Sequence, residues 1–387
     1  MFRKASAVLT AAVVLVATFA GAASAYTPEP GPLFNNPRGN LEAKNRLLTK
    51  IVKTINSTPP HSTIRIAAYS NDRRDVVDAL IAAHKRGVDV QMVLNDNWTS
   101  GQTNRLSRVI GRDTNRRSFL SICAGACRGG YGNQHMKFYL FTKAGKAKNV
   151  VMQGSVNTTG YGARTQWNDL FTTTGKKKLL DLYTKIFEQL VRDRRVSKPF
   201  VHKTVGRYEV EFNPHPKTTP ETDPVMRRLN GIRCNATNGT GRNGHTVIRI
   251  AMYGWRAERG MYLADKVASL DKKGCDVRVI ASAPGHQVVG RLKRGGVLIK
   301  SADLDLDNND NTGFGDTAYE VFTHQKYMAV SGNYRGDMGY NVWDGSENWS
   351  GMGLINDEVT LRIPNKGAYN GFTANFDYVW TNWSRWY

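Results

Sequence analysis

The chain has 387 residues, more than a typical single domain and enough for two lobes that each bury a core. Its composition is that of a globular protein, and it has no long polar or low-complexity tract, which excludes wholesale disorder. The formal net charge of +22 favours anionic partners such as nucleic acid, an anionic membrane surface or phosphate esters. An exported protein that is basic only for solubility would carry the same charge, so charge alone does not choose among these partners.

The N-terminal segment has the pattern of a secretory signal peptide. Arg3 and Lys4 precede an apolar run at residues 5–20, and Ala-Ser-Ala at residues 23–25 matches a small-residue cleavage site. We therefore expect a signal peptide at residues 1–25 and a secreted, extracellular mature chain, whose net charge without those two cations is +20. A membrane anchor that is never cut is the alternative.

Four cysteines, Cys123, Cys127, Cys234 and Cys275, fit an exported chain. An even number in that setting predicts two disulfides, and three pairings are possible. We favour Cys123–Cys127, which closes a small loop, and Cys234–Cys275 within the second half. The alternative is a metal site at the Cys-x3-Cys sequence, but no histidine lies close to it.

An internal repeat organises the rest of the chain. The hexapeptide IRIAAY at residues 64–69 recurs as IRIAMY at residues 248–253, and both copies are typical of short buried strands. Each is followed by an amphipathic helix and then by a second strand, expected at residues 88–94 and 275–280.

The halves also match at their ends, where long amphipathic helices are expected near residues 179–190 and 369–383. The period of about 185 residues indicates duplicated lobes rather than a solenoid. Strand–helix–strand units predict an α/β fold with mainly parallel sheets between helices. We therefore expect two tandem pseudo-symmetric α/β/α sandwich lobes, at residues 26–204 and 205–387.

Each half carries an H-x-K motif at the matching point of the repeat. The motifs are His135/Lys137 and His324/Lys326, and apolar residues follow both. This pattern predicts strands, in which a period of two places the histidine and the lysine on the same face.

A G-S-x-N sequence follows each motif at a similar distance along the chain, at residues 154–157 and 345–348. Two H-x-K motifs in register, each with its own G-S-x-N, resemble the phospholipase D superfamily. The resemblance covers nearly the whole mature chain, because the order of strands and helices also fits that family's duplicated fold. It implies phospholipase D-type lobes with one active site at their interface.

The sequence departs from that family at two positions. Thr142 and Ser331 stand at the fifth position after each motif lysine, where the family has an aspartate. This aspartate is usually a supporting residue in the family, so its replacement casts doubt on substrate subclass more than on reaction type.

The residue types predict phosphodiester chemistry without a metal or another cofactor. Lysines and asparagine amides stabilise the negative charge that develops on phosphate oxygens. One imidazole attacks phosphorus to form a phosphohistidine, and the other protonates the leaving alcohol and then activates water. The resemblance makes His135 the nucleophile and His324 the acid/base, although the sequence itself does not break their symmetry. The expected catalytic lysines and phosphate-binding residues are Lys137, Lys326, Asn157, Asn348, Ser155 and Ser346.

A nucleophilic histidine needs a partner that fixes its tautomer. Asp169 follows His135 at the same spacing along the chain as Glu358 follows His324. These two carboxylates are the candidates, with Asp357 as a rival in the second half.

An acidic segment at residues 303–316 offers oxygen ligands at several positions of a 12-residue calcium loop, from Asp305 to Asp316. It lacks the central glycine and the terminal glutamate of that motif, so a solvated surface loop is the preferred interpretation.

Three functions fit these patterns. The first is a secreted phospholipase D that hydrolyses phospholipid head-group phosphodiester bonds. The second is a metal-independent nuclease of the same superfamily, which the positive charge favours. The third is a non-catalytic binder of anionic surfaces. One chain contains both halves of the site, so we expect a monomer.

Overall fold

The structure is a computed structural model, and it describes residues 26–237, 239–306 and 320–387. The predicted signal peptide lies outside these residues, as does most of the acidic segment considered for calcium. Among the described residues, no helix is both long and apolar enough to cross a membrane.

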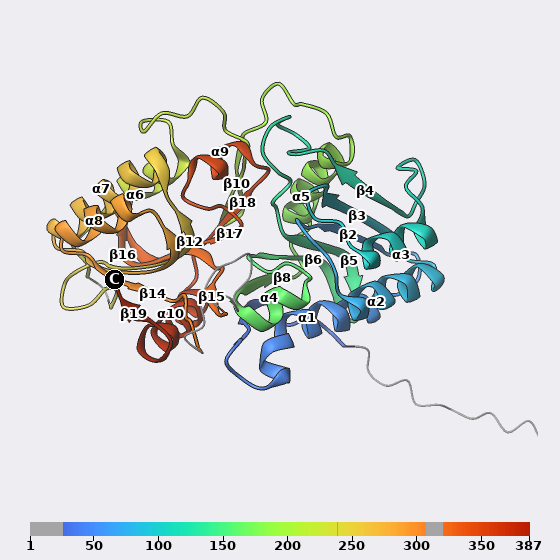
Figure 1. Cartoon of the computed structure of the whole chain (residues 1–387), viewed down its shortest axis with the longest axis horizontal. Helices are drawn as coiled ribbons and strands as arrows, with labels where there is room; N and C mark the ends of the chain where they lie inside the picture. The colour runs from blue at the N-terminus through green and yellow to red at the C-terminus, as the bar shows by residue number, and fades with distance from the viewer. Residues whose placement is uncertain (1–25, 238, 307–319) are drawn as a thin grey trace, which may run out of the picture.

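The N-terminal half, coloured blue to green, and the C-terminal half, coloured yellow to red, lie side by side (Figure 1). Within the described residues, the first half contains a seven-stranded sheet in the order β1-β8-β6-β5-β2-β3-β4. Its strands are β1 (Gly31–Phe34), β2 (Thr63–Ala67), β3 (Asp89–Asn95), β4 (Phe119–Cys123), β5 (Phe138–Ala144), β6 (Ala147–Gly154) and β8 (Asp169–Thr173).

The described part of the second half contains a ten-stranded sheet, in which β11 pairs with β16 beside the main order β19-β14-β13-β12-β16-β17-β18-β10-β9. Its strands are β9 (Val201–Val205), β10 (Tyr208–Phe212), β11 (Ile232–Arg233), β12 (Val247–Trp255), β13 (Asp276–Pro284), β14 (Leu298–Ser301), β16 (Lys326–Tyr334), β17 (Asp337–Gly345), β18 (Val359–Ile363) and β19 (Arg385–Trp386).

Helices cover both faces of each sheet. In the first half α1, α2 and α3 form one layer with a shared apolar core, and α5 packs on the other face. In the second half α6, α7 and α8 form the outer layer, and α10 packs on the inner face. The helices are α1 (Leu41–Asn56), α2 (Arg74–Lys85), α3 (Gly101–Ile110), α4 (Gly160–Thr165), α5 (Lys177–Val191), α6 (Pro224–Asn230), α7 (Ala257–Lys272), α8 (His286–Arg294), α9 (Gly351–Ile355) and α10 (Lys366–Asn382).

These layers confirm the predicted α/β class with two pseudo-symmetric lobes. The expectation of mainly parallel sheets is wrong. Only β2–β3, β3–β4, β12–β13 and β13–β14 pair in parallel within the two large sheets as described. The remaining pairs are antiparallel, and two of them, β5–β6 and β16–β17, are joined directly by short turns without a crossover helix.

The H-x-K motifs lie at strand starts rather than inside strands, which corrects the predicted boundaries. His135 and Lys137 precede β5, and β16 begins at Lys326, after His324. The reason is that the peptide N–H groups of both histidines donate to the opposite lobe and not to their own sheet.

A short two-stranded sheet links the lobes close to these motifs. Strand β7 (Gln166–Trp167) of the first half pairs in parallel with β15 (Phe322–Thr323) of the second half. On the other side of the pseudo-symmetric arrangement, Gln134 and Asp357 form an isolated parallel bridge. The two connections place the equivalent segments of both halves against each other.

Both expected disulfides are present, Cys123–Cys127 and Cys234–Cys275. They indicate a non-reducing environment for the folded chain. The two cysteines considered for metal binding lie close to the carboxylate of Asp193, but the disulfide occupies both of their sulfur atoms.

Candidate active site

The two motif histidines are held at the lobe interface by matching backbone bonds. The peptide N–H of His135 donates to the carbonyl of Asp357 at 3.0 Å, and that of His324 donates to the carbonyl of Trp167 at 2.9 Å. Each histidine is therefore anchored by the lobe to which it does not belong. The two imidazoles are close enough for the charge of His135 to lower the pKa of His324.

Glu358 holds the imidazole of His135. The Nδ1 atom of His135 lies 2.9 Å from both carboxylate oxygens of Glu358. The hydroxyl of Ser346 donates to the same carboxylate at 2.5 Å, and the amide of Asn356 donates to it at 3.0 Å. These contacts fix the ring and leave Nε2 of His135 for chemistry.

An amide, not a carboxylate, holds the second histidine. Nδ1 of His324 lies 3.0 Å from Oδ1 of Asn168. The Asn168 side chain is itself held through Nδ2, which donates to the carbonyl of Gly162 at 3.2 Å. Because an amide oxygen only accepts hydrogen bonds, Nδ1 of His324 carries the proton and its Nε2 is left for chemistry.

The equal spacing along the chain predicts Asp169 as the counterpart of Glu358, and this prediction is wrong. The peptide N–H groups of Asp169 and Val359 donate to the equivalent hydroxyls of Ser155 and Ser346, across sequence separations of 14 and 13 respectively. The first loop is thus longer by a single position, and Asn168 is the structural counterpart of Glu358. Asp169 contacts neither imidazole among the hydrogen bonds of the described residues, so it is a supporting residue here.

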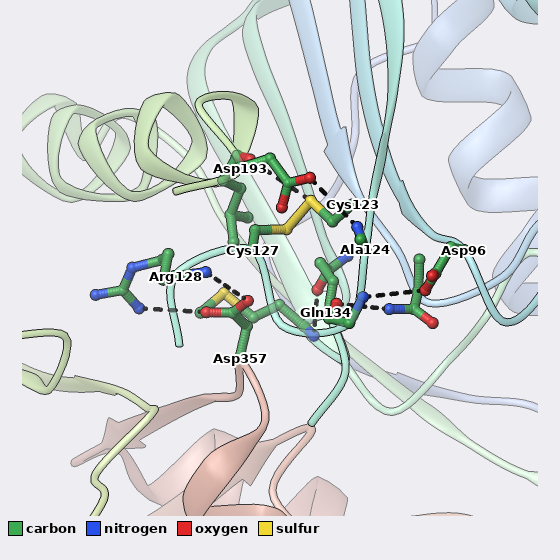
Figure 2. Close-up of a disulfide and its surroundings, with 12 residues drawn as sticks. Asp96, Cys123, Ala124, Cys127, Arg128, Gln134, Asp193 and Asp357 are labelled. Carbon is green, nitrogen blue, oxygen red and sulfur yellow. Dashed lines mark hydrogen bonds and ion pairs between the residues drawn. A yellow bond between two sulfur atoms is a disulfide. The ribbon is translucent and has the colours of Figure 1, made fainter. Parts of the chain in front are cut away.

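Asp357, the rival candidate, also has another role. Its carboxylate accepts the peptide N–H of Arg128 at 3.3 Å and lies 3.9 Å from the Arg128 guanidinium. Figure 2 shows Asp357 reaching from the second lobe to the loop closed by Cys123–Cys127. Burial raises the pKa of Asp357 to about 7.

The two motif lysines are buried and point back at their own histidines. Nζ of Lys137 donates to the carbonyl of His135 at 2.6 Å, and Nζ of Lys326 donates to the carbonyl of His324. A period of two therefore does place each lysine beside its histidine, although the histidines precede the strands.

Each half of the site also contains one tyrosine that the sequence analysis did not assign to it. The ring of Tyr69 lies 5.4 Å from that of His135, and the ring of Tyr253 lies 5.1 Å from that of His324. The lysine ammonium groups lie over the same rings, at 5.5 Å for Lys137 and 5.0 Å for Lys326. Both tyrosines end the repeated hexapeptide, which is the signal that could have revealed them.

Positive charge and burial together set the electrostatics of the site. Burial lowers the pKa of Lys137 to about 7, and burial with the charge of Lys137 lowers the pKa of Lys326 well below its ordinary value. Burial also lowers the pKa of His135, against the raising effect of Glu358. The pKa of His324 is lowered further by burial and by both lysines. An anion bound among these groups would favour all their protonated forms.

The predicted phosphate-binding residues divide into two kinds. The hydroxyls of Ser155 and Ser346 are buried and fix neighbouring strands, which gives them a positioning role in place of the predicted contact with phosphate. The amide oxygen of Asn157 is buried and has no hydrogen-bond partner among the described residues. In Asn348 the oxygen accepts the N–H of Gly254 at 3.0 Å, and this orientation leaves Nδ2 for a ligand.

Residues 51–191, about a third of the chain, match the family model described as "Cardiolipin synthase, PLD-like domain". The chain contains a phospholipase D-like domain. The relationship to the phospholipase D superfamily that the paired motifs suggested is thereby confirmed. Members of this superfamily act on phosphodiesters, so the match supports a phosphodiester- or phospholipid-modifying activity. No curated protein sequence matches the chain.

Solved structures share the phospholipase D-like fold at low identity. Phosphatidylserine synthase from Haemophilus influenzae Rd KW20 is similar over 93% of this chain and 90% of its own, with 10% identity and a TM-score of 0.61. Polyphosphate kinase from Porphyromonas gingivalis is similar over 90% of this chain with 13% identity and a TM-score of 0.55. The chain spans only half the length of that kinase, 50%. At these identities the likeness concerns the fold alone.

The two positions that depart from the phospholipase D pattern have structural roles. The hydroxyl of Thr142 accepts the peptide N–H of Thr63 at 2.9 Å, and the hydroxyl of Ser331 accepts that of Gly241 at 2.8 Å. Both hydroxyls satisfy backbone donors well beyond the start of the strand that follows the motif. Neither of these two contacts involves a motif histidine or lysine.

A buried pair of carboxyl groups lies beneath the phospholipase D-like site. The side chains of Asp169 and Asp344, one from each lobe, contact each other, and Nε2 of Gln153 donates to Asp344 at 2.9 Å. Burial raises the pKa of both carboxyl groups. The neighbouring Asp169 raises that of Asp344 further, whereas the hydrogen bond with Asp344 opposes the rise for Asp169. Such a pair retains one proton between its oxygens, and it borders Lys326, whose charge acts on both.

Proposed function

We propose that the chain hydrolyses phospholipid head-group phosphodiester bonds through a phosphohistidine intermediate. The observation that carries this proposal is the unequal anchoring of two imidazoles at one interface, by Glu358 for His135 and by Asn168 for His324. The buried lysines supply the positive charge that a phosphodiester requires.

The difference between the partners of the two imidazoles supports His135 as the nucleophile. Attack by Nε2 on phosphorus places positive charge on the ring, and the Glu358 carboxylate stabilises that charge through Nδ1–H. The P–N bond forms as the bond from phosphorus to the leaving oxygen breaks. Lys137, Lys326 and the asparagine amides would hold the non-bridging oxygens during this step.

His324 suits the acid/base role because its anchor is neutral. Without a carboxylate it gives up its Nε2 proton readily to the leaving oxygen. Its pKa is low in the free site, and the negative charge of a bound phosphodiester would raise the protonated fraction before the reaction. In the second step Nε2 of His324 accepts a proton from water, the water oxygen attacks phosphorus, and the P–N bond breaks.

Lipid as the substrate class is supported by the family model and by the secretory pattern at the N-terminus. The net charge of +22 supports a second candidate, cleavage of nucleic acid by the same groups. The two candidates use one reaction and differ in what binds beyond the phosphate.

The test is a parallel assay of the purified protein and of His135→Ala and His324→Ala variants. The substrates are phosphatidylcholine vesicles, anionic phospholipid vesicles and plasmid DNA. We expect release of the lipid head group by the wild type, and loss of it in both variants with the fold retained by circular dichroism. Cleavage of DNA with no action on either lipid would replace the lipid proposal by the nuclease.

The roles of the histidines are separated by an activated diester, bis(p-nitrophenyl) phosphate. Its good leaving group needs no acid, so His324→Ala should still release about one equivalent of nitrophenol per enzyme and then stop. His135→Ala should give no burst. A burst from His135→Ala and none from His324→Ala would reverse the two roles.

A further inference from the structure

A pocket of about 510 Å³ lies between the two lobes, at the opposite end of strand β8 from the candidate active site. Strand β8 begins at Asp169, beneath the phospholipase D-like site, and ends at Thr173, which lines the pocket. Four positions along an extended strand correspond to about 13 Å. The pocket is therefore separate from the place where the proposed reaction occurs.

Both lobes contribute walls to this pocket. The first lobe supplies Pro32 of β1, the end of β8 and Lys176, and the second supplies Arg207, Tyr208 and the start of α10. Close packing of α10 on β1 holds these walls together, because a Cβ atom at Gly371 would lie only 2.7 Å from Cγ of Pro32. A ligand in the pocket would therefore touch both lobes at once.

The lining of the pocket carries positive charge that is not balanced locally. Lys176 and Arg207 line it, and no carboxylate of the described residues does. Neither cation forms an ion pair within the described part of the chain, whereas the adjacent Lys177 pairs with Asp181 at 2.8 Å. Nη2 of Arg207 instead donates to the hydroxyl of Tyr208 at 3.3 Å, which keeps the guanidinium at the pocket. Two unpaired cations from different lobes attract an anion to this place.

The hydroxyl of Thr173 is a buried polar group without a partner. Thr173 is 3% exposed, and its Oγ1 has no hydrogen-bond partner among the described residues. A period of two places its side chain on the same face of β8 as Phe171, which packs in a core cluster with Tyr208 and Ala368 of the second lobe. The Thr173 side chain thus faces the second lobe, on the side where the pocket lies. Burial of such a hydroxyl is costly unless a ligand reaches it.

The first turn of α10 adds backbone donors to the pocket. Asn365 and Gly367 line it, and the side chain of Asn365 accepts the N–H of Ala368 at 2.8 Å. The N–H groups of Lys366 and Gly367 have no partner within the helix, and the N-terminus of this 17-residue helix favours negative charge. Cations, N–H groups and a hydroxyl together offer donors from several directions, which suits a tetrahedral phosphate group better than a planar carboxylate.

We propose that this pocket binds the phosphate group of a phosphate monoester and thereby bridges the two lobes. The phosphate lies between Lys176, Arg207 and the start of α10, and Thr173 donates to one of its oxygens. The pocket has more room than a phosphate group fills, and Pro32 and Tyr208 offer apolar surface to the organic part of the ester. This binding does not require the proposed reaction, so its test is independent of that function.

Calorimetry with glycerol 3-phosphate tests the site. Because the active site also attracts phosphate, the measured quantity is the number of ester molecules bound per chain. The double variant Lys176→Gln/Arg207→Gln should bind one ester fewer than the wild type. The control Lys203→Gln/Arg233→Gln removes the same charge from exposed residues outside the pocket and should keep the wild-type number. Equal numbers in the wild type and the pocket variant would overturn the proposal, and an equal affinity for acetate would overturn phosphate as the ligand class.

Thr173→Val removes the unpaired hydroxyl and keeps the shape of the side chain. We expect it to weaken ester binding about fivefold. It should also raise the unfolding temperature of the ligand-free protein, because a costly buried polar group is gone. These opposite effects distinguish a ligand contact from a purely structural role, and unchanged ester affinity in the folded variant would contradict the proposed geometry.

A soluble ester and the head group of phosphatidic acid in a membrane present the same phosphate group. Sedimentation with vesicles that contain phosphatidic acid separates these two sources. Weaker vesicle binding by Lys176→Gln/Arg207→Gln than by the control double variant assigns the site to the lipid head group. Equal vesicle binding by the two variants, together with the lost glycerol 3-phosphate site, assigns it to a soluble ester.

Discussion

Nδ1 of His135 lies 2.9 Å from both carboxylate oxygens of Glu358, and the two residues belong to different lobes. The equivalent contact across the pseudo-symmetry joins His324 to an amide, that of Asn168. A duplicated fold has thus produced two imidazoles with unequal partners, which is what a reaction with one nucleophile and one acid requires.

The first prediction concerns Glu358 as a positioning residue. Glu358→Gln keeps an acceptor for Nδ1 but removes the negative charge, so we expect kcat to fall about 10- to 100-fold. The pKa of His135 should fall further, because the carboxylate raises it in the wild type. The acid limb of the pH–rate profile should therefore move to lower pH. Glu188→Gln on the exposed side of α5 is the control, and an unmoved acid limb would contradict the assignment.

The second prediction separates the two disulfides. Their sequence separations of 4 and 41 correspond to stabilities of about 2 and about 4 kcal/mol in the chain-entropy model. Replacing Cys234 and Cys275 by serine should therefore cost more free energy of unfolding than replacing Cys123 and Cys127.

Activity should follow the opposite order. The loop closed by Cys123–Cys127 contains Gly125, whose carbonyl accepts the N–H of Gln134 at 2.8 Å, next to His135. Loss of this disulfide should lower kcat of the folded protein, whereas loss of the other should leave kcat unchanged. Urea unfolding and turnover of the folded fraction measure the two effects, and equal loss of kcat in both variants would refute the distinction.

The third prediction concerns the pH dependence of stability. Burial and the neighbouring Asp169 raise the pKa of Asp344 far above its value in the unfolded chain. The group's contribution to stability is full below pH about 4 and is lost as pH rises toward the folded pKa, at about 1.4 kcal/mol per pH unit. Asp344→Asn should therefore become more stable relative to the wild type as pH rises from 5 to 8.

Urea unfolding at several pH values measures that difference, and the exposed Asp113→Asn serves as the control. Stability curves of wild type and Asp344→Asn that run parallel over this range would show that the pair does not retain a proton.

The sequence by itself determined the duplication and the paired H-x-K motifs, and it favoured the disulfide pairing that the structure then confirmed among three possible ones. These features depend on local patterns, namely a repeated hexapeptide, residue spacing and an even number of cysteines, and they remain visible without any long-range contact. The α/β class followed from the same periodicities, although direct hairpins such as β5–β6 made the sheets mixed.

Only the tertiary structure decided which residue serves which histidine. Spacing along the chain relates positions within one lobe, whereas the side chains that hold the two histidines reach across the interface. In addition, one loop is longer by a single position, which puts Asn168 in the place expected for Asp169.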